Sequence, residues 1–325
     1  MIRVAVDGMG GDRAPEEIVA GAAAAASPDI EPVLYGPAGM SGLGLHVVEA
    51  SEVIGTSEPP VDAVRAKTDS SLVRAVQAVA DGEADAVVSA GNTGATLTAS
   101  LLHIRRLPGV IRPAIAVVIP ARRRPTVLID SGANADARPE QLLQFAHMGA
   151  VFAEEILEAS DPEVRLLSIG EEDEKGNQLT LEAHELLRAS GLRFTGNTES
   201  RRLLEGEADV VVCDGFTGNV ALKAVEGTIR SLLDAIRGEI DSTMLGKLGG
   251  LLIRPAARRV RHRLDPETYG GAYLLGLQGL VVIAHGSSSR VAIANAVRLA
   301  ARGVEHRIVE RLEEGLPARV AVPRA

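Results

Sequence analysis

The sequence predicts an α/β/α sandwich built around a mostly parallel β-sheet. Short runs of Val, Ile and Leu recur along the chain, and each run is followed by a loop of Gly, Asn, Asp or Ser and then by a longer helical pattern. This alternation is typical of parallel strands joined by helices. The chain has 325 residues, of which 46% are hydrophobic and 24% are charged, so it is long enough to bury a large core. We expect a single domain over residues 1–325.

Six strands and their loops are predicted in chain order. The apolar runs occupy residues 2–6, 86–89, 126–129, 166–169, 210–213 and 281–284. The polar loops that follow them occupy residues 7–12, 89–95, 130–134, 170–172, 214–219 and 285–288. Ligands of open parallel sheets bind at the carboxyl ends of the strands. These loops are therefore expected to converge on one cleft.

The loop at residues 89–95 (SAGNTGA) has the pattern of an anion site. A strand stops at a glycine, a tight polar loop exposes backbone N–H groups, and a helix begins. Residues 82–94 align with residues 206–218, and both segments read as strand, Gly-x-Thr-Gly and helix. We interpret the pair as two pseudo-equivalent oxyanion loops that face one cleft. The alternative is that both are ordinary glycine-containing strand ends.

Composition argues against several classes of function. Aromatic residues make up only 2% of the chain, there is no Trp, and the net charge is -9, which disfavours nucleic-acid binding. The single cysteine excludes an intrachain disulfide or a cysteine zinc cluster and suits a reducing cytoplasm. The N-terminus lacks the pattern of a signal peptide, and no apolar run approaches the ~20 residues of a membrane span. We expect a cytoplasmic protein that at most lies on a membrane surface.

Nucleotide, metal and thiol chemistry lack their usual motifs. The segment 7–12 (DGMGGD) does not have the Gly-x-Gly-x-x-Gly spacing of a dinucleotide site, and there is no Walker sequence. The seven histidines form no compact ligand cluster, so we expect no metal and no cofactor. Cys213 ends an apolar run, where cysteine usually acts as a small buried hydrophobic residue rather than a nucleophile.

Two lysines and one serine-rich loop could hold an anion. Lys67 lies just before a helix and upstream of the first glycine loop, where it could close over a bound phosphate. Lys223, in the helix after the second loop, is a similar candidate, although a solvated lysine is the ordinary alternative. The loop after His285 contains Gly286 and Ser287 and opens a helix; its hydroxyl and amide groups suit an anion.

The segment 240–264 is predicted to form a projecting helical hairpin. Gly246, Gly249, Gly250 and Pro255 should break a single helix here. One face of the segment is apolar, with Met244, Leu245, Leu248, Leu251 and Leu252, and arginines 254, 258, 259, 261 and 263 follow. We assign Leu248, Leu251, Leu252, Arg258 and Arg259 to a membrane or partner surface. Packing against a second subunit is the structural alternative.

Eight ordered segments together resemble the phosphate acyltransferase family. They are residues 5–12 (AVDGMGGD), 89–94 (SAGNTG), 112–113 (RP), 130–134 (DSGAN), 170–177 (GEEDEKGN), 213–219 (CDGFTGN), 270–272 (GGA) and 285–288 (HGSS). The resemblance runs nearly from end to end. It departs at Arg13, where the family commonly has histidine; arginine preserves a positive charge.

The resemblance implies a fold, a reaction and partners. The family fold is similar to that of isopropylmalate dehydrogenases and phosphate acetyltransferases and is commonly a homodimer. Its members transfer a fatty acyl group from acyl-acyl-carrier-protein to inorganic phosphate, and the acyl phosphate enters phospholipid synthesis. A membrane glycerol-3-phosphate acyltransferase consumes the product. For this chain, a nicotinamide-dependent dehydrogenase of the isopropylmalate type and a non-enzymatic lipid-surface adaptor are the alternatives.

The implied chemistry is direct attack of phosphate on a thioester. Phosphate is a competent nucleophile and a thiolate leaves readily, so the protein needs mainly to position charges. We expect phosphate near Asn92, Thr93 and Gly94 with Lys67 and Arg13, and the oxyanion near Thr217, Gly218 and Asn219. Asp7, Asp214 and His285 would orient these groups or move a proton. The other expected binding residues are Gly10, Gly11, Ser89, Gly91, Gly286 and Ser287.

An acidic carrier protein requires a basic docking surface. The dense basic clusters of the sequence are Arg122, Arg123 and Arg124 and the arginines of residues 254–263. A solvated turn is an equally weighted interpretation of the first cluster.

Overall fold

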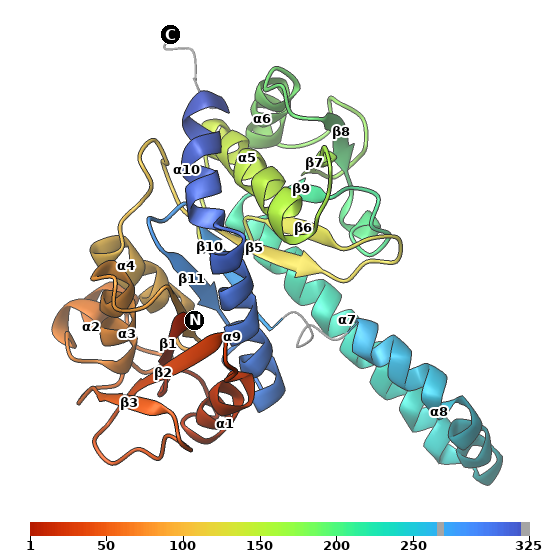
Figure 1. Cartoon of the computed structure of the whole chain (residues 1–325). Helices are drawn as coiled ribbons and strands as arrows, with labels where there is room; N and C mark the ends of the chain where they lie inside the picture. Colours follow the sequence, from red (N-terminus) through yellow and green to blue (C-terminus); the bar gives the residue numbers. More distant parts are fainter. Residues whose placement is uncertain (265–269, 320–325) are drawn as a thin grey trace.

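One mixed sheet organises the molecule (Figure 1). The computed structural model describes the backbone of residues 1–264 and 270–319 and the side chains of residues 1–260 and 270–316. Within these ranges eleven strands form one sheet in the order β3-β2-β1-β4-β11-β10-β5-β6-β9-β7-β8. The strands are β1 (Ile2–Asp7), β2 (Ile30–Gly36), β3 (His46–Glu49), β4 (Ala86–Ser89), β5 (Ala114–Ile119), β6 (Thr126–Ile129), β7 (Val164–Leu167), β8 (Phe194–Thr198), β9 (Val210–Val212), β10 (Ala272–Leu275) and β11 (Leu280–Ile283).

The six strands predicted from the sequence are confirmed. They correspond to β1, β4, β6, β7, β9 and β11. The other five, β2, β3, β5, β8 and β10, were not among the predicted ones. The prediction relied on an apolar run followed by a loop of small polar residues, and edge strands such as β3, whose residues are exposed or half-buried, do not show it.

The sheet is mostly parallel, as predicted, but its middle is antiparallel. β10 pairs antiparallel with both β11 and β5, and β5 pairs antiparallel with β6. All other pairings are parallel. The strands β6, β9, β7 and β8 therefore run opposite to β1, β4 and β11. The prediction that all six loops follow strands of one direction is wrong, because three neighbouring pairings reverse the chain.

Helices cover both faces of the sheet, which confirms the sandwich (Figure 1). One face carries α1 (Glu16–Ala25), α5 (Pro139–Ile156), α6 (Gln178–Arg188), α9 (Arg290–Glu305) and α10 (Ile308–Arg319). The other carries α2 (Pro60–Ala66), α3 (Ser71–Ala80), α4 (Thr93–His103) and the start of α7 (Gly215–Ser242). Side chains alternate between the faces: Val127 and Ile129 join the first core, while Leu128 joins the second side. A short 3₁₀ helix, η1 (Ser200–Arg202), completes the described elements.

The predicted hairpin projects from the body, but its boundaries differ from the prediction (Figure 1). It consists of α7 and α8 (Met244–Leu264), and the chain turns at Thr243. The predicted break within residues 246–255 is wrong, because α8 continues through its glycines and Pro255. A Cβ atom on Gly246 would lie 2.5 Å from the Ile240 carbonyl oxygen, and one on Gly250 would lie 2.6 Å from Ile240 Cγ2. These glycines let the two helices approach. The side chains of Arg261 and Arg263 lie outside the described residues.

Two helical glycines provide a test of the packing of α1 against α9. A Cβ on Gly21 of α1 would lie 2.5 Å from Ile293 Cβ and 2.7 Å from the Arg290 carbonyl oxygen of α9, whereas a Cβ on Gly238 of α7 would meet nothing within 4 Å. We expect Gly21→Ala to lower the free energy of unfolding by about 1–3 kcal/mol through overpacking. The control, Gly238→Ala, should raise it by about 0.5–1 kcal/mol through helix propensity. Urea unfolding followed by circular dichroism measures both, and equal effects would contradict the assigned α1–α9 contact.

Candidate active site

Asp7 connects three segments at the end of β1. Its side chain is 3% exposed and accepts hydrogen bonds from Ser71 Oγ at 2.6 Å and Ser89 Oγ at 2.8 Å. Burial raises the pKa of Asp7, while the hydroxyl donors oppose that shift. The carboxyl group therefore fixes α3 and β4 to β1 and is sealed from solvent. Of the two roles expected for Asp7, to orient groups or to move a proton, this buried position suits the orienting one.

The loops after β1, β4 and β11 interlock through glycines. A Cβ on Gly10 would lie 2.4 Å from Asp7 Oδ2 and 2.8 Å from the Gly91 nitrogen. Gly11 has φ +109°, and a Cβ there would lie 3.1 Å from the Gly286 carbonyl oxygen. The Asp12 N–H donates to the same carbonyl at 2.8 Å. The glycines expected to bind substrate thus serve first to bring three loops together.

The N-terminus of α4 presents two free backbone amides. Asn92 is the N-cap: its Oδ1 accepts from the Ala95 N–H at 3.1 Å, and its carbonyl accepts from the Thr96 N–H at 2.9 Å. The N–H groups of Thr93 and Gly94 precede these bonds and have no intrahelical acceptor. Thr93 is exposed and Gly94 is half-buried. An anion can therefore approach this helix end from solvent.

Asn92 and Lys67 are engaged by protein groups. Asn92 Nδ2 donates to the carbonyl oxygens of Thr56 and Glu58, at 2.9 and 3.3 Å. Lys67 Nζ donates to the Val53 carbonyl at 2.8 Å and pairs with Glu58 Oε1 at 2.7 Å. The Asn92 amide thus anchors residues 56–58 beside the helix; its expected contact with phosphate stays a prediction. Lys67 holds the same segment with two of its three ammonium N–H groups, which leaves the third to donate to a ligand.

Asp130 is the residue that the sequence analysis missed. Its buried carboxylate follows β6 and accepts five N–H groups: the backbone amides of Ile115, Gly132, Ala133 and Asn134, and Asn134 Nδ2, at 2.7–3.1 Å. The Gly215 N–H in turn donates to the Asn134 carbonyl oxygen at 2.8 Å. Asp130 thus organises the loop against which α7 begins. An aspartate directly after a buried apolar run was the available signal.

The start of α7 differs in register from the start of α4. Asp214 is the N-cap and accepts from the Thr217 N–H at 2.9 Å and from Thr217 Oγ1 at 2.7 Å. The Gly218 N–H donates to the Asp214 carbonyl at 2.9 Å. Gly218 therefore lies a turn inside its helix, whereas its counterpart Gly94 lies at the first turn. The backbone amides of Thr217 and Gly218 are occupied, so the two loops are not equivalent oxyanion sites; the Asn219 side chain is exposed.

Lys223 and His285 bring the two halves of the sheet together. Lys223 Nζ of α7 lies 2.9 Å from His285 Nε2, in the loop after β11, and 3.0 Å from Glu226 Oε2. His285 Nε2 therefore faces the Lys223 ammonium group, and Nδ1 faces both the Ser287 hydroxyl at 2.9 Å and the Ser287 backbone nitrogen at 3.3 Å. His285, Lys223 and Ser287 are all exposed. We call the interlocked loops of residues 7–13, 89–94 and 285–287, together with Asn219 and Lys223, the loop junction.

Arg13 adds an uncommitted positive charge to the loop junction. Its side chain is exposed, and in the described part of the chain its guanidinium has no hydrogen-bond or ion-pair partner. Neighbouring Glu17 pairs with Arg290, and this interaction, with a smaller electrostatic contribution from Arg13, lowers the pKa of Glu17 to about 2. Arg13 is thus available to an anion from solvent.

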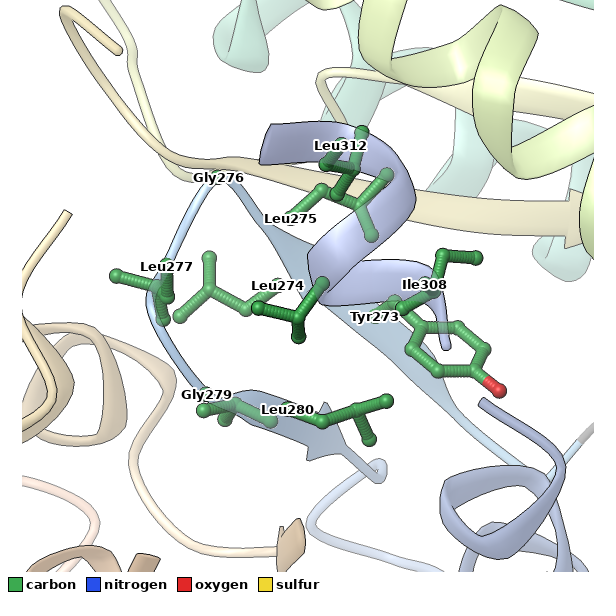
Figure 2. Close-up of a pocket in the computed structure, with 11 residues that line it drawn as sticks. Tyr273, Leu274, Leu275, Gly276, Leu277, Gly279, Leu280, Ile308 and Leu312 are labelled. Atoms are coloured by element: carbon green, nitrogen blue, oxygen red, sulfur yellow. The ribbon is translucent and has the colours of Figure 1, made fainter. Parts of the chain in front are cut away.

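Two hollows of the described structure are lined by residues outside the loop junction. One is lined by apolar residues of β10, β11 and α10, including Tyr273, Leu275 and Leu312, and holds about 10 Å³, the room of one water (Figure 2). A second, of about 460 Å³, lies against β2 and α3 between Tyr35 and Arg74. Among the described residues, no three His, Cys, Asp or Glu side chains gather to bind a metal, and no helix is long and apolar enough to cross a membrane. The expectation of a cleft between the loops is not supported by either hollow.

The fold is similar to that of phosphate-dependent acyltransferases. A branched-chain phosphotransacylase from Enterococcus faecalis superposes with a TM-score of 0.62 and 17% identity, over 94% of this chain and 100% of that one. The EutD phosphotransacetylase from Staphylococcus aureus gives 0.58 and 16%, over 93% and 94%. A 4-hydroxythreonine-4-phosphate dehydrogenase from Klebsiella pneumoniae gives 0.53 and 14%, over 94% and 98%. At these identities the similarity establishes the architecture alone.

Sequence similarity is much stronger. The model of the family described as "Fatty acid synthesis protein" matches residues 2–311. The chain is 46% identical to the phosphate acyltransferase of Heliobacterium modesticaldum over 98% of its length and 99% of the relative's. It is 47% identical to that of Desulfitobacterium hafniense over 98% of both. Because the match covers nearly the whole chain at close to half identity, this protein belongs to the fatty acid synthesis protein family, together with the phosphate acyltransferases, and is an enzyme of the acyltransferase class.

Proposed function

We propose that this enzyme transfers a fatty acyl group from acyl-acyl-carrier-protein to inorganic phosphate and releases acyl phosphate. One observation carries the proposal: the loop junction combines the helix amides of exposed Thr93 and half-buried Gly94 with the exposed Lys223–His285 pair and exposed Arg13. These groups suit a small dianion. The names of the relatives support acyl transfer to phosphate. The dehydrogenase alternative lacks a dinucleotide motif and is not favoured.

The reaction needs positioning more than proton transfer. A phosphate oxygen forms a bond to the thioester carbonyl carbon, the tetrahedral oxyanion collapses, and the C–S bond breaks. The thiolate, whose acid has a pKa of about 8.5, leaves without strong acid help. Phosphate at the α4 N-terminus is held by the two amides and Arg13, with Lys67 as a reserve donor. Asn219 Nδ2 and Lys223 Nζ lie on α7 to stabilise the oxyanion.

Carrier protein and membrane engage separate surfaces in our proposal. Arg123 and Arg124 are committed to Glu207 and Asp209, at 3.8 and 3.0 Å, and they precede β6, at the strand end opposite the loop that follows it. This cluster is therefore a poor docking site. In the described part of the hairpin, Arg254, Arg258 and Arg259 are exposed and form no ion pair, so they suit an acidic carrier.

The apolar end of the hairpin is proposed as a peripheral membrane contact. Leu245, Leu248, Leu251 and Leu252 are 59–81% exposed, which is unusual for residues of this size. Contact with the inner face of the membrane would place the product near a membrane glycerol-3-phosphate acyltransferase. We propose a cytoplasmic homodimer in which this end stays free.

A phosphate-dependent assay tests the function. Purified enzyme and palmitoyl-acyl-carrier-protein should lose thioester only when phosphate is present, and phosphorus NMR should show acyl phosphate in equal amount. Thioester loss at the same rate without phosphate would indicate a hydrolase and would reject the proposal.

Lys223 provides the sharpest test of the site. Lys223→Met removes a charged donor worth about 1.5–3 kcal/mol, so kcat/KM for phosphate should fall about 10- to 100-fold, and Lys223→Arg should recover part of it. Lys247→Met, at an exposed lysine of α8, is the matched control and should behave as the unsubstituted enzyme. Equal rates for Lys223→Met and the control would remove Lys223 from the mechanism.

Cys213 should play no covalent role. It is 2% exposed, and burial together with the nearby Asp214 and Asp130 raises the pKa of its thiol, so the thiolate is scarce at neutral pH. We expect the native protein to react with a thiol reagent many times more slowly than the urea-unfolded protein. Cys213→Ala should retain turnover. Trapping of an acyl group on Cys213 would contradict direct attack.

The hairpin proposal is tested by vesicle sedimentation. Leu248→Asp combined with Leu252→Asp should abolish sedimentation with phosphatidylglycerol vesicles, because both side chains lose their apolar contact with the bilayer. Turnover on soluble substrates and the mass from light scattering should not change. Leu181→Asp, at an exposed leucine of α6, is the control. A change in mass without a change in sedimentation would make this surface a subunit contact instead.

A further inference from the structure

The first turns of α7 have a fixed orientation against the sheet. Gly215, Gly218 and Ala221 are buried, and a Cβ on Gly218 would lie 1.9 Å from the Asp130 carbonyl oxygen. The helix therefore cannot rotate without a backbone clash. The side chains on its other faces are held toward solvent in a defined direction.

Two stripes of side chains run along the exposed side of these turns. Asn219 and Lys223 are four residues apart and form a polar stripe; Phe216 and Val220 are also four apart and form an apolar stripe. Each member of one stripe lies three residues from a member of the other, so the stripes are neighbours on the helix surface. The contact of Lys223 with His285 places the polar stripe at the loop junction. The apolar stripe therefore borders the loop junction.

The apolar stripe is unusual for this protein. Phe216 is 66% exposed and Val220 is 54% exposed. The chain has four phenylalanines, all within the described residues; Phe145 and Phe152 are fully buried and Phe194 is half-buried. Phe216 alone is exposed, directly beside Asp214 and Thr217 at the start of the helix. Because Phe216 is 66% exposed, burial in the protein core does not account for an aromatic side chain at this position.

The stripe continues along α7 over small residues. Ala224 and Gly227 follow Val220 on the same side and are exposed, and a Cβ on Gly227 would meet nothing within 4 Å. Beyond the two larger side chains, the helix therefore offers a low, open apolar track that leads away from the loop junction. Such a track suits an extended hydrocarbon chain, because Ala224 and Gly227 carry at most a methyl group and, among the described residues, nothing lies within 4 Å of a Cβ on Gly227.

We propose that Phe216 and Val220 bind the acyl chain of the donor and determine chain-length preference. This inference rests on the proposed function. The thioester carbonyl lies at Asn219 and Lys223, and the methylenes next to it cross Phe216 and Val220 toward Gly227. One face of α7 thus recognises the thioester carbonyl of the donor, and the adjoining face recognises its hydrocarbon chain.

Donors of different acyl-chain length distinguish binding of the acyl chain by Phe216 and Val220 from a general effect on activity. The double variant Phe216→Ser/Val220→Ser should lose about tenfold in kcat/KM with palmitoyl-acyl-carrier-protein, because the apolar contact with the chain is lost. It should stay within twofold of the unsubstituted enzyme with butyryl-acyl-carrier-protein, and KM for phosphate should not change. Leu181→Ser, at an exposed leucine of α6, is the matched control and should change neither rate.

A binding measurement gives a readout independent of turnover. An unreactive long-chain acyl phosphonate should bind the unsubstituted enzyme more tightly than a short-chain one by calorimetry, and the double variant should lose that difference. Equal loss with both donors, or loss accompanied by dissociation of a dimer in light scattering, would overturn the inference and make the stripe a subunit contact. If the unsubstituted enzyme consumed neither donor, the proposed function itself would fail, while the phosphonate measurement would still decide whether the stripe binds hydrocarbon.

Discussion

The three antiparallel pairings in the middle of the sheet control where the polar loops can meet. They make β6 and β9 run opposite to β1, β4 and β11, so in a flat sheet the two sets of loops would lie on opposite edges. Five pairings separate β4 from β9, and a twist of about 20–25° at each turns one strand about 100–125° relative to the other. The Lys223–His285 contact agrees with this geometry. The site therefore depends on sheet twist as much as on any side chain.

Three aspartates hold the loops at the ends of the strands in place. Asp7 binds the hydroxyls of Ser71 and Ser89, Asp130 binds five N–H groups, and Asp214 caps α7 through Thr217. Each carboxylate closes a strand of the sheet and accepts hydrogen bonds from its own surroundings. Their negative charge is thereby compensated within the protein, which leaves the exposed cations and amides of the loop junction to act on a ligand.

The sequence was sufficient to predict elements that are determined by neighbouring residues in the chain. Apolar runs ending in small polar residues located β1, β4 and β9, and the family resemblance identified the reaction class. The hydrogen-bond partners of a side chain could not be predicted from its neighbours in the sequence. Asn92 has the pattern of an anion ligand, yet its side-chain amide donates to the carbonyl oxygens of Thr56 and Glu58. The glycines of α8 looked like helix breakers because their neighbour across the hairpin, Ile240, is visible only in three dimensions. Asp130 was missed although four of its five donors come from residues 132–134 of its own loop; only the Ile115 N–H comes from a strand distant in sequence.

The distribution of charge favours electrostatic positioning over acid–base catalysis. Two of the residues expected to orient groups or move a proton are a buried anchor, Asp7, and a helix cap, Asp214, and Cys213 is buried. Donors outnumber carboxylates among the exposed groups of the loop junction: Arg13, Lys223, Asn219 and the Thr93 amide stand beside one exposed carboxylate, that of Asp12. Donors of this kind stabilise a phosphate dianion and a thioester oxyanion without accepting a proton. The chemistry of the proposed substrates, a nucleophile that is already anionic and a thioester with a good leaving group, would be matched by a site rich in hydrogen-bond donors.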